Sequence, residues 1–450
     1  MSSDKKRTIF FNLLLMIASI IATLLITECI FRLVSPQNLT GSWFVSTDNG
    51  LLVNKSSGTS KHQLENRIVR YSFYEPNFRG TPIKEDGIKI LVVGDSFTFG
   101  LLLEEEDTYV HHLQQFTDME FGEGVFQYLN AAVGGWGTAD YVAYIEDFRN
   151  IVKPDIILVF FNGMNINRSV NRGIYTLSDE NKLMLKRHIL KPPKLKYIIN
   201  SIPCYQWLIE NSHLAQFVKA SILTRQYNNK IRKQTVSKKK LAKKPSAQSN
   251  VSHEKSNDLA KQTASRKELA QKPTSQSNIS HEKSNDLAKQ TVSKKKLAKK
   301  TSAQSNVSHE KSNDLAKQTA SRKELAQKPT SQSNISHDNG SNLVKALFKR
   351  LKIWCDTNHI SLCVTTTGWY NMSHALGNTS EFFQSIEIPF IDIAPSVSGR
   401  IGDNRSEFIF QGDGHPNEKG SKLIADMSWK FFIKNQLHEY YRTKENSNIP

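Results

Sequence analysis

A serine and a histidine that together could cleave an ester lie far apart in this chain of 450 residues. Ser96 follows a mostly apolar run, Ile88–Val93, which reads as a buried strand that Gly94 ends. A serine hydroxyl is a poor nucleophile until a base takes its proton, and His415 is the candidate base. Asp413, two residues earlier, can hold the imidazole in the required tautomer and stabilise its charged form. These residues predict acyl transfer through a serine nucleophile.

Attack on an ester creates an oxyanion, which needs hydrogen-bond donors that are fixed in advance. Residues 130–138 form a glycine-rich turn in which the backbone N–H of Gly135 can approach a substrate closely. Asn165 follows the next strand-like run and brings a side-chain amide to the same edge. We expect three donors, the N–H groups of Ser96 and Gly135 and the amide of Asn165, each typically worth ~10²–10³ in rate. Each segment alone reads as a loop or a helix cap, but all of them in order along one sheet favour a catalytic site.

Five apolar runs have strand character, and helical patterns alternate with them. The runs cover residues 88–93, 125–133, 155–161, 359–366 and 388–394. Strand–helix alternation of this kind predicts a parallel sheet that helices cover on both faces. We therefore expect an α/β fold with a five-stranded parallel sheet, whose strands carry the site at their carboxyl ends. Residues 29–85 are expected to be a membrane-proximal segment of turns and short strands.

Residues 8–28 are expected to cross a membrane. Lys5, Lys6 and Arg7 precede an almost wholly apolar stretch of about twenty residues, enough to span a hydrocarbon core of roughly 30 Å. A cleaved signal peptide is the alternative, but its apolar region is usually about 7–15 residues long, and no small-residue cleavage site follows here. The basic cluster predicts that residues 1–7 stay in the cytoplasm and that the catalytic part lies outside, in a periplasmic or extracellular location.

Residues 234–337 are a tandem array of near-copies of one 28-residue unit, the last of them cut short. Each unit offers too few apolar residues to stack into a solenoid, so we expect this array to be disordered. It holds 22 lysine and arginine residues against 8 acidic ones, which accounts for +14 of the formal net charge of +18. The basic composition therefore describes an insertion and does not indicate specific nucleic-acid binding. The array can contact anionic lipid or acidic polysaccharide by non-specific attraction, or it can be a spacer without a partner.

The segments on either side of the array read as two parts of one domain. The first part covers residues 86–233 and the second covers residues 338–440, followed by a tail at 441–450. The array then falls in the long connection between the third and fourth strands, where an insertion costs little beyond loop closure. Deleting residues 234–337 is therefore expected to leave activity largely intact.

The four cysteines do not form a disulfide framework. Cys29 lies at the edge of the apolar N-terminal stretch, and Cys204, Cys355 and Cys363 follow outside it. Cys355 and Cys363 lie in apolar surroundings, where small buried side chains are expected; a bridge between these two is the alternative.

Four motifs of the chain resemble the sequence blocks of the SGNH (GDSL) hydrolases. They are the segment 94–100, the turn through Gly135, the Gly163-x-Asn165 element and the segment 413–417. Residues 70–80 resemble the lead-in of membrane-anchored members of this family. The family often places its acid three residues before the histidine, whereas position 412 is glycine here and Asp413 stands two residues before it.

The resemblance implies a flavodoxin-like three-layer α/β/α fold and esterase chemistry that needs no metal and no cofactor. It implies that Ser96 is the nucleophile and that Gly135 and Asn165 are oxyanion donors. Asp413 and His415 then complete the triad. The expected substrate is an acyl ester, for example an acetyl ester, of a carbohydrate or a lipid outside the membrane.

Two other functions stay open for the same residues. An O-acyltransferase that modifies a cell-envelope polysaccharide would use them too, because exclusion of water decides between transfer and hydrolysis. A catalytically silent binding protein could keep the fold, although the intact Ser96, Asn165 and His415 speak against it. Because a free histidine titrates near pH ~6.5, a base at His415 predicts activity that declines in mild acid.

Overall fold

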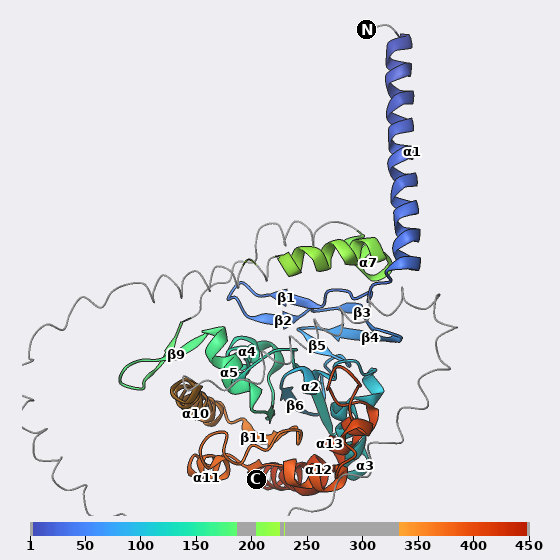
Figure 1. Cartoon of the computed structure of the whole chain (residues 1–450). Coiled ribbons are helices and arrows are strands. Elements are labelled where there is room, and N and C mark those ends of the chain that lie inside the picture. The colour runs from blue at the N-terminus through green and yellow to red at the C-terminus, as the bar shows by residue number, and fades with distance from the viewer. Residues whose placement is uncertain (1–2, 187–203, 226–228, 230–332, 448–450) are drawn as a thin grey trace, which may run out of the picture. The chain divides into compact units, whose positions relative to one another are not determined.

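The computed structural model describes residues 3–186, 204–225, 229 and 333–447 (Figure 1). Residues 1–225 and 332–450 belong to one compact unit. The predictions for the repeat array at 234–337, both its disorder and its contacts, fall on residues that lie almost wholly outside the described ones.

The central sheet is built around the five predicted strands, which run parallel to one another. They are β6 (Ile88–Val93), β7 (Phe126–Asn130), β8 (Ile156–Phe161), β11 (Ser361–Thr366) and β12 (Phe390–Ile391). Their spatial order is β7-β6-β8-β11-β12, so the strand that precedes Ser96 lies inside the sheet and not at its edge. The buried strands read as continuous apolar runs because helices cover both faces. The prediction of an α/β fold is confirmed.

The whole sheet has eight strands, and the prediction of a five-stranded, wholly parallel sheet is wrong. Antiparallel strands extend it beyond β7: β5 (Phe78–Arg79), β4 (Arg67–Tyr74) and β3 (Gly58–Leu64). They come from the segment 29–85, to which the sequence assigns only turns and short strands. In β4 every second side chain, such as Val69 and Tyr71, faces the core, while the others stay at least partly exposed. A strand buried on one face gives a weaker apolar signal than a buried parallel strand.

Two short antiparallel hairpins stand apart from the main sheet. They pair β1 (Phe44–Ser46) with β2 (Leu52–Asn54), and β9 (Tyr175–Leu177) with β10 (Leu183–Leu185). Next to the first hairpin, Trp43 packs in an apolar cluster with Tyr71 and Phe99. Because Phe99 lies three residues after Ser96, this cluster joins the segment 29–85 to the part of the domain that carries the serine.

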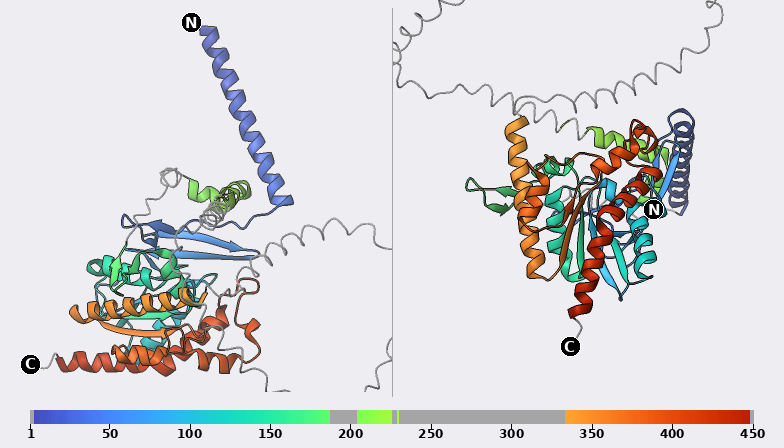
Figure 2. Two further views of the ribbon diagram at one scale, coloured as in Figure 1. Left: turned by 60° about the vertical axis from the view of Figure 1, so that its left-hand side comes forward. Right: turned by 90° about the horizontal axis from the view of Figure 1, so that it is seen from below.

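Helices cover both faces of the sheet, which gives three layers (Figures 1 and 2). One face carries α4 (Thr138–Val152), α5 (Met164–Arg172), α10 (Ser333–Thr357) and α11 (Thr379–Ser385), and the other carries α3 (Tyr109–Phe121), α12 (Ala394–Ile401), α13 (Glu418–Ser428) and α14 (Lys434–Ser447). A π-helical turn, Trp429–Ile433, joins α13 to α14. Successive side chains of β6 enter the two core clusters in turn, Leu91 and Val93 on one face, Ile90 and Val92 on the other.

Cys355 and Cys363 are both free and buried. Cys355 on α10 belongs to the core cluster on one face of the sheet, and Cys363 on β11 belongs to the cluster on the other face. Burial raises the pKa of each thiol to about 12. The prediction of small buried side chains is confirmed, and the alternative of a bridge between them is wrong because the sheet separates them.

Among the described residues, α1 (Ser3–Val34) is the one helix that is long and apolar enough to cross a membrane. Near its C-terminal end it meets α7 (Tyr205–Asn211) and a helical segment at 213–225 (Figure 1). Arg32 Nη2 donates to the carbonyl of Asn211 at 2.9 Å. The end of α1 is therefore bonded to a part of the chain that follows it by more than 170 residues.

Candidate active site

Ser96 stands at the first position of the short helix α2 (Ser96–Phe99), just beyond the end of β6. Asp95 caps this helix, because its carboxylate accepts a hydrogen bond from the N–H of Phe97 at 3.0 Å. Gly94 must lack a side chain, since a Cβ there would lie 1.8 Å from Thr98 Oγ1. The turn therefore holds Ser96 at the carboxyl edge of the sheet, where it is 7% exposed.

Ser96, His415 and Asp413 lie next to one another, although the serine and the histidine are 319 positions apart. Ser96 Oγ donates to His415 Nε2 at 2.7 Å. The other ring nitrogen, Nδ1, faces Asp413 Oδ1, which only accepts, so Nδ1 carries the proton of the neutral ring. The structure thus brings together the three residues predicted as nucleophile, base and orienting acid, in the arrangement that activation of a hydroxyl requires.

The loop that carries His415 is tied to its surroundings by backbone and side-chain bonds. The N–H of Phe410 donates to the His415 carbonyl at 2.8 Å. Asn417 caps α13, since its side chain accepts from the N–H of Gly420 at 3.1 Å. Burial opposes ionisation of Asp413, but the hydrogen bonds from His415 outweigh it and lower the pKa of this carboxyl. The acid is therefore ionised beside the imidazole at neutral pH.

Among the described residues, two backbone N–H groups in the turns at this edge of the sheet have no protein acceptor. The N–H of Ser96 is the first of α2, where helix geometry provides no carbonyl partner. Gly135 has a φ of +83°, which favours glycine, and within the described part of the chain its N–H donates to no protein acceptor. Its turn passes beside the serine, since a Cβ on Gly134 would lie 3.8 Å from Ser96 Cβ. The turn that contains Gly135 therefore lies beside the turn that carries Ser96.

Asn165, the third predicted donor, lies on α5 and is fully buried. Its Oδ1 accepts from the N–H of Asn162 at 2.7 Å, which sets the direction of the amide. Its Nδ2 donates to the carbonyl of Trp136 at 3.2 Å and to Asp95 Oδ2 at 3.5 Å. The structure therefore brings Asn165 into the cluster around Asp95, with its amide N–H groups bound to protein acceptors and not turned toward open space beside Ser96.

Asp95 has two further partners that the sequence patterns do not reveal. Its carboxylate has no exposed surface, and Oδ2 accepts from Asn162 Nδ2 at 2.5 Å and from Arg168 Nη1 at 2.6 Å. A buried carboxylate needs such partners, since an unpaired one would be strongly unfavourable. One signal was available: Asn162 directly follows β8, and Arg168 lies one helical turn after Asn165. The network ties the turn under Ser96 to the neighbouring strand.

The segment 29–85 also approaches the triad, through His62 on β3. His62 Nδ1 and the hydroxyl of Tyr71 are hydrogen-bonded at 2.7 Å, and that hydroxyl also accepts from the N–H of Leu102 at 2.9 Å. Burial lowers the pKa of His62 to about 4, an effect that the charge of Asp413 opposes and that of His415 reinforces. The ring is therefore neutral at pH 7, and it lies close enough to the triad to sense its charges.

Replacing His62 by glutamine is expected to make folding less sensitive to mild acid. The ring stays neutral in the folded chain down to about pH 4, whereas an unfolded histidine binds a proton near pH ~6.5. The unfolded state binds more protons between these values, so stability falls as the pH drops, by about 2 kcal/mol at pH 5 for this residue. Glutamine keeps a hydrogen-bonding partner for Tyr71 without titrating.

Urea unfolding at pH 7.5 and at pH 5 measures this difference. The free energy of unfolding of wild type should fall by more than that of H62Q, and the exposed His374→Gln variant should behave as wild type. Equal losses in wild type and H62Q would contradict the assignment of a neutral, partly buried ring.

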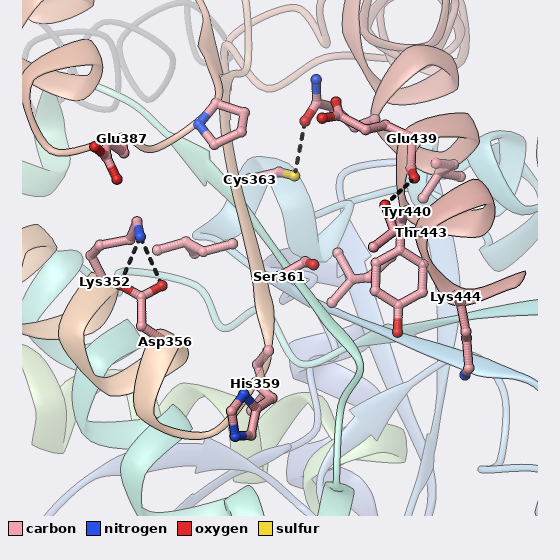
Figure 3. A pocket seen from close by; sticks show the side chains of 16 residues that line it. Lys352, Asp356, His359, Ser361, Cys363, Glu387, Glu439, Tyr440, Thr443 and Lys444 are labelled. Carbon is pink, nitrogen blue, oxygen red and sulfur yellow. Dashed lines mark hydrogen bonds and ion pairs between the residues drawn. The ribbon is translucent and has the colours of Figure 1, made fainter. Parts of the chain in front are cut away.

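A cavity of about 720 Å³ lies at the opposite edge of the sheet (Figure 3). Ile156 and Ser361, which line it, are the first residues of β8 and β11, whereas Ser96 follows the last residue of the parallel strand β6. On its wall Lys352 pairs with Asp356 at 2.7 Å. The cavity is therefore separate from the triad. Within the described ranges no group of three or more His, Cys, Asp or Glu side chains is placed to hold a metal ion.

No protein-family model matches the chain, and no curated protein matches its sequence. Solved structures are similar to it at low identity. TesA is 9% identical, with a TM-score of 0.32, over 76% of this chain and 96% of TesA. The psychrotrophic esterase EstA from Pseudoalteromonas sp. is 10% identical (TM-score 0.33; 78% and 98% covered), and the acetyl xylan esterase AlAXEase is 11% identical (TM-score 0.32; 77% and 100% covered). At these values the likenesses carry no conclusion about chemistry, which rests on the geometry of the site.

Proposed function

We propose that the chain is an anchored, outward-facing serine acyl hydrolase of the SGNH (GDSL) type. It removes an acyl group, for example acetyl, from a carbohydrate or lipid ester. The observation that carries the proposal is the 2.7 Å hydrogen bond from Ser96 Oγ to His415 Nε2, with Asp413 on the other side of the ring. The parallel strands follow the order 2-1-3-4-5 that is typical of flavodoxin-like sheets, which supports the three-layer fold of this family.

The first half of the proposed reaction transfers the acyl group to the enzyme. Ser96 Oγ attacks the acyl carbon while its proton passes to His415 Nε2, and the ionised Asp413 stabilises the imidazolium. The oxyanion of the tetrahedral intermediate accepts from the N–H groups of Ser96 and Gly135. When the intermediate collapses, Nε2 returns the proton to the leaving alkoxide, and an acyl-serine remains.

The second half of the reaction releases the acyl group. Water attacks the acyl-serine while His415 Nε2 takes its proton. When this second intermediate collapses, Nε2 returns the proton to Ser96 Oγ and the carboxylic acid is released. Asn165 adds a third donor when its Nδ2 turns from the carbonyl of Trp136 toward the oxyanion. In the described state the same amide orients Asp95, and through it the turn that carries the nucleophile.

The helix α1 supplies the anchor in this proposal. Residues 8–28 cross the bilayer, residues 1–7 lie in the cytoplasm, and the catalytic domain lies outside. The exposed apolar side chains along α1, among them Phe10, Leu14 and Leu25, support this, because a bilayer would cover them.

A fluorophosphonate probe tests the catalytic proposal on the full chain in detergent. Such a probe reacts with a serine that a base has activated, so we expect covalent labelling that peptide mass spectrometry locates at Ser96. H415A should abolish the labelling. The exposed His359→Asn variant, at the amino edge of the sheet, should leave it unchanged. A folded chain that stays unlabelled would overturn the hydrolase and favour a silent binding protein.

The fate of the acyl group separates hydrolysis from transfer. With an aryl acetate as donor, we expect free acetate as the product, whether or not a sugar is added. Acetylated sugar formed at the expense of free acetate would favour the O-acyltransferase.

A further inference from the structure

The helix α7 binds the domain through polar side chains. Gln206 and Glu210 lie one helical turn apart and face the edge of β3. Gln206 Nε2 donates to Ser60 Oγ at 2.9 Å, and Glu210 Oε1 accepts from the N–H of Lys61 at 3.1 Å. The polar side of this helix therefore points inward, toward the sheet.

The helical segment 213–225 is arranged in the same way. Gln216 and Lys219 both donate to the carbonyl of Thr40, Lys219 at 3.0 Å. A surface helix of a soluble domain normally does the reverse and turns its apolar stripe to the core. Apart from Ile209, which is buried, the side chains that these two helices turn toward the domain are thus mainly polar, and we call this arrangement inverted.

The outward side of both helices carries large apolar side chains, and in the second helix Ser221, Thr224 and Arg225 are exposed as well. These large apolar side chains are 42% to 64% exposed, and they are Trp207, Leu208, Phe217, Val218, Ile222 and Leu223. An apolar surface of this kind marks an interaction site, because exposing it to water is unfavourable. We call the two helices, residues 205–225, the inverted helix pair.

The inverted helix pair is continuous with the end of α1 (Figures 1 and 2). Glu28 on α1 accepts from the N–H groups of His213 and Leu214, both at 3.0 Å, and so caps the second helix. The rings of Phe31 and Phe217 meet with their centroids 4.7 Å apart. The contact between Phe31 and Phe217 therefore joins the apolar surface of α1 to the apolar side of the pair.

We propose that the inverted helix pair lies on the lipid bilayer that α1 crosses, with its apolar side in the boundary between headgroups and acyl chains. The proposal rests on the anchor of the proposed function. The bonds to α1 favour lipid over a protein partner as the ligand of this surface. The cap at Glu28 holds the apolar side of the pair at the place where the anchor leaves the bilayer. The polar bonds to β3 then hold the catalytic domain in one orientation on the membrane.

Quenching of tryptophan fluorescence by brominated lipid tests the proposal. Trp207 is the most exposed of the six tryptophans, all of which lie in the described residues. The full chain is placed in phosphatidylcholine vesicles with or without bromine on the upper part of the acyl chains. We expect a bromine-dependent loss of emission in wild type, most of which disappears in W207F. The control W354F, which removes a partly buried tryptophan of α10, should keep that loss.

Flotation of the vesicles separates failure of the anchor from failure of the inverted helix pair. Wild type and W207F should both float with the vesicles after carbonate extraction. If both proteins float but show equal bromine-dependent losses of emission, the proposal is wrong, and the apolar side of the pair would instead bind a protein partner. A chain that does not float would overturn the anchor, and the proposal with it.

Discussion

Replacing Ser96 by alanine is expected to lower kcat/KM for a short-chain aryl ester by about 10⁴-fold or more, with the fold intact. The variant lacks the attacking oxygen, so only the oxyanion donors and substrate binding remain to assist water. The fold should persist because, among the described residues, the Ser96 hydroxyl bonds only to His415. Release of the aryl alcohol by the purified full chain measures the loss, and circular dichroism checks the fold.

The double variant S96A/H415A makes this test sharper. Residues that act as one catalytic unit are strongly non-additive, so the double variant should be no slower than either single variant. The exposed His359→Asn variant controls for the loss of a histidine. Equal rates in wild type and S96A would remove the assignment of the nucleophile. If kcat/KM of the double variant fell by the product of the two single-variant factors, the serine and the histidine would act independently.

The parallel part of the sheet could be predicted because buried parallel strands are apolar without interruption. All five predicted strands are present, although β12 is only two residues long. The antiparallel extension was missed because its strands are buried on one face only. In β4, Val69 and Tyr71 face the core while Ile68 and Arg70 face solvent. A pattern of this kind resembles that of a loop unless the pairing partner is known.

The residues of the candidate triad could be predicted because each follows a strand or precedes a helix near the carboxyl edge. The geometry of Asn165 could not, since the direction of an amide depends on its neighbours. The N–H of Asn162 binds the oxygen of that amide and the carbonyl of Trp136 binds its nitrogen, and neither contact has a sequence signal. The spacing of Arg168 from Asn165 is a weak sequence signal, but its bond to Asp95 also depends on how α5 packs beside the turn that carries Ser96.

Replacing Arg79 by alanine is expected to lower the free energy of unfolding by about 3–5 kcal/mol. The guanidinium is fully buried, and it donates to the carbonyls of Phe99, Gly100 and Leu103, the last two at 2.6 Å. It also pairs with Glu105 at 3.1 Å. Alanine would leave buried carbonyls without donors in the loop that follows α2, and each unsatisfied group costs about 1–3 kcal/mol.

Through Arg79, the antiparallel extension supports the loop that follows Ser96. The sequence does not predict this extension, but it does predict Ser96 as the candidate nucleophile. Thermal unfolding in detergent should separate R79A from R70A, because Arg70 is an exposed arginine of the neighbouring strand whose loss should change stability by no more than about 0.5 kcal/mol. R79K should fall between them, since one ammonium cannot reach the carbonyls that the planar fork spans. If R79A were as stable as R70A, water would have to satisfy those carbonyls, and the loop after Ser96 would not depend on the extension.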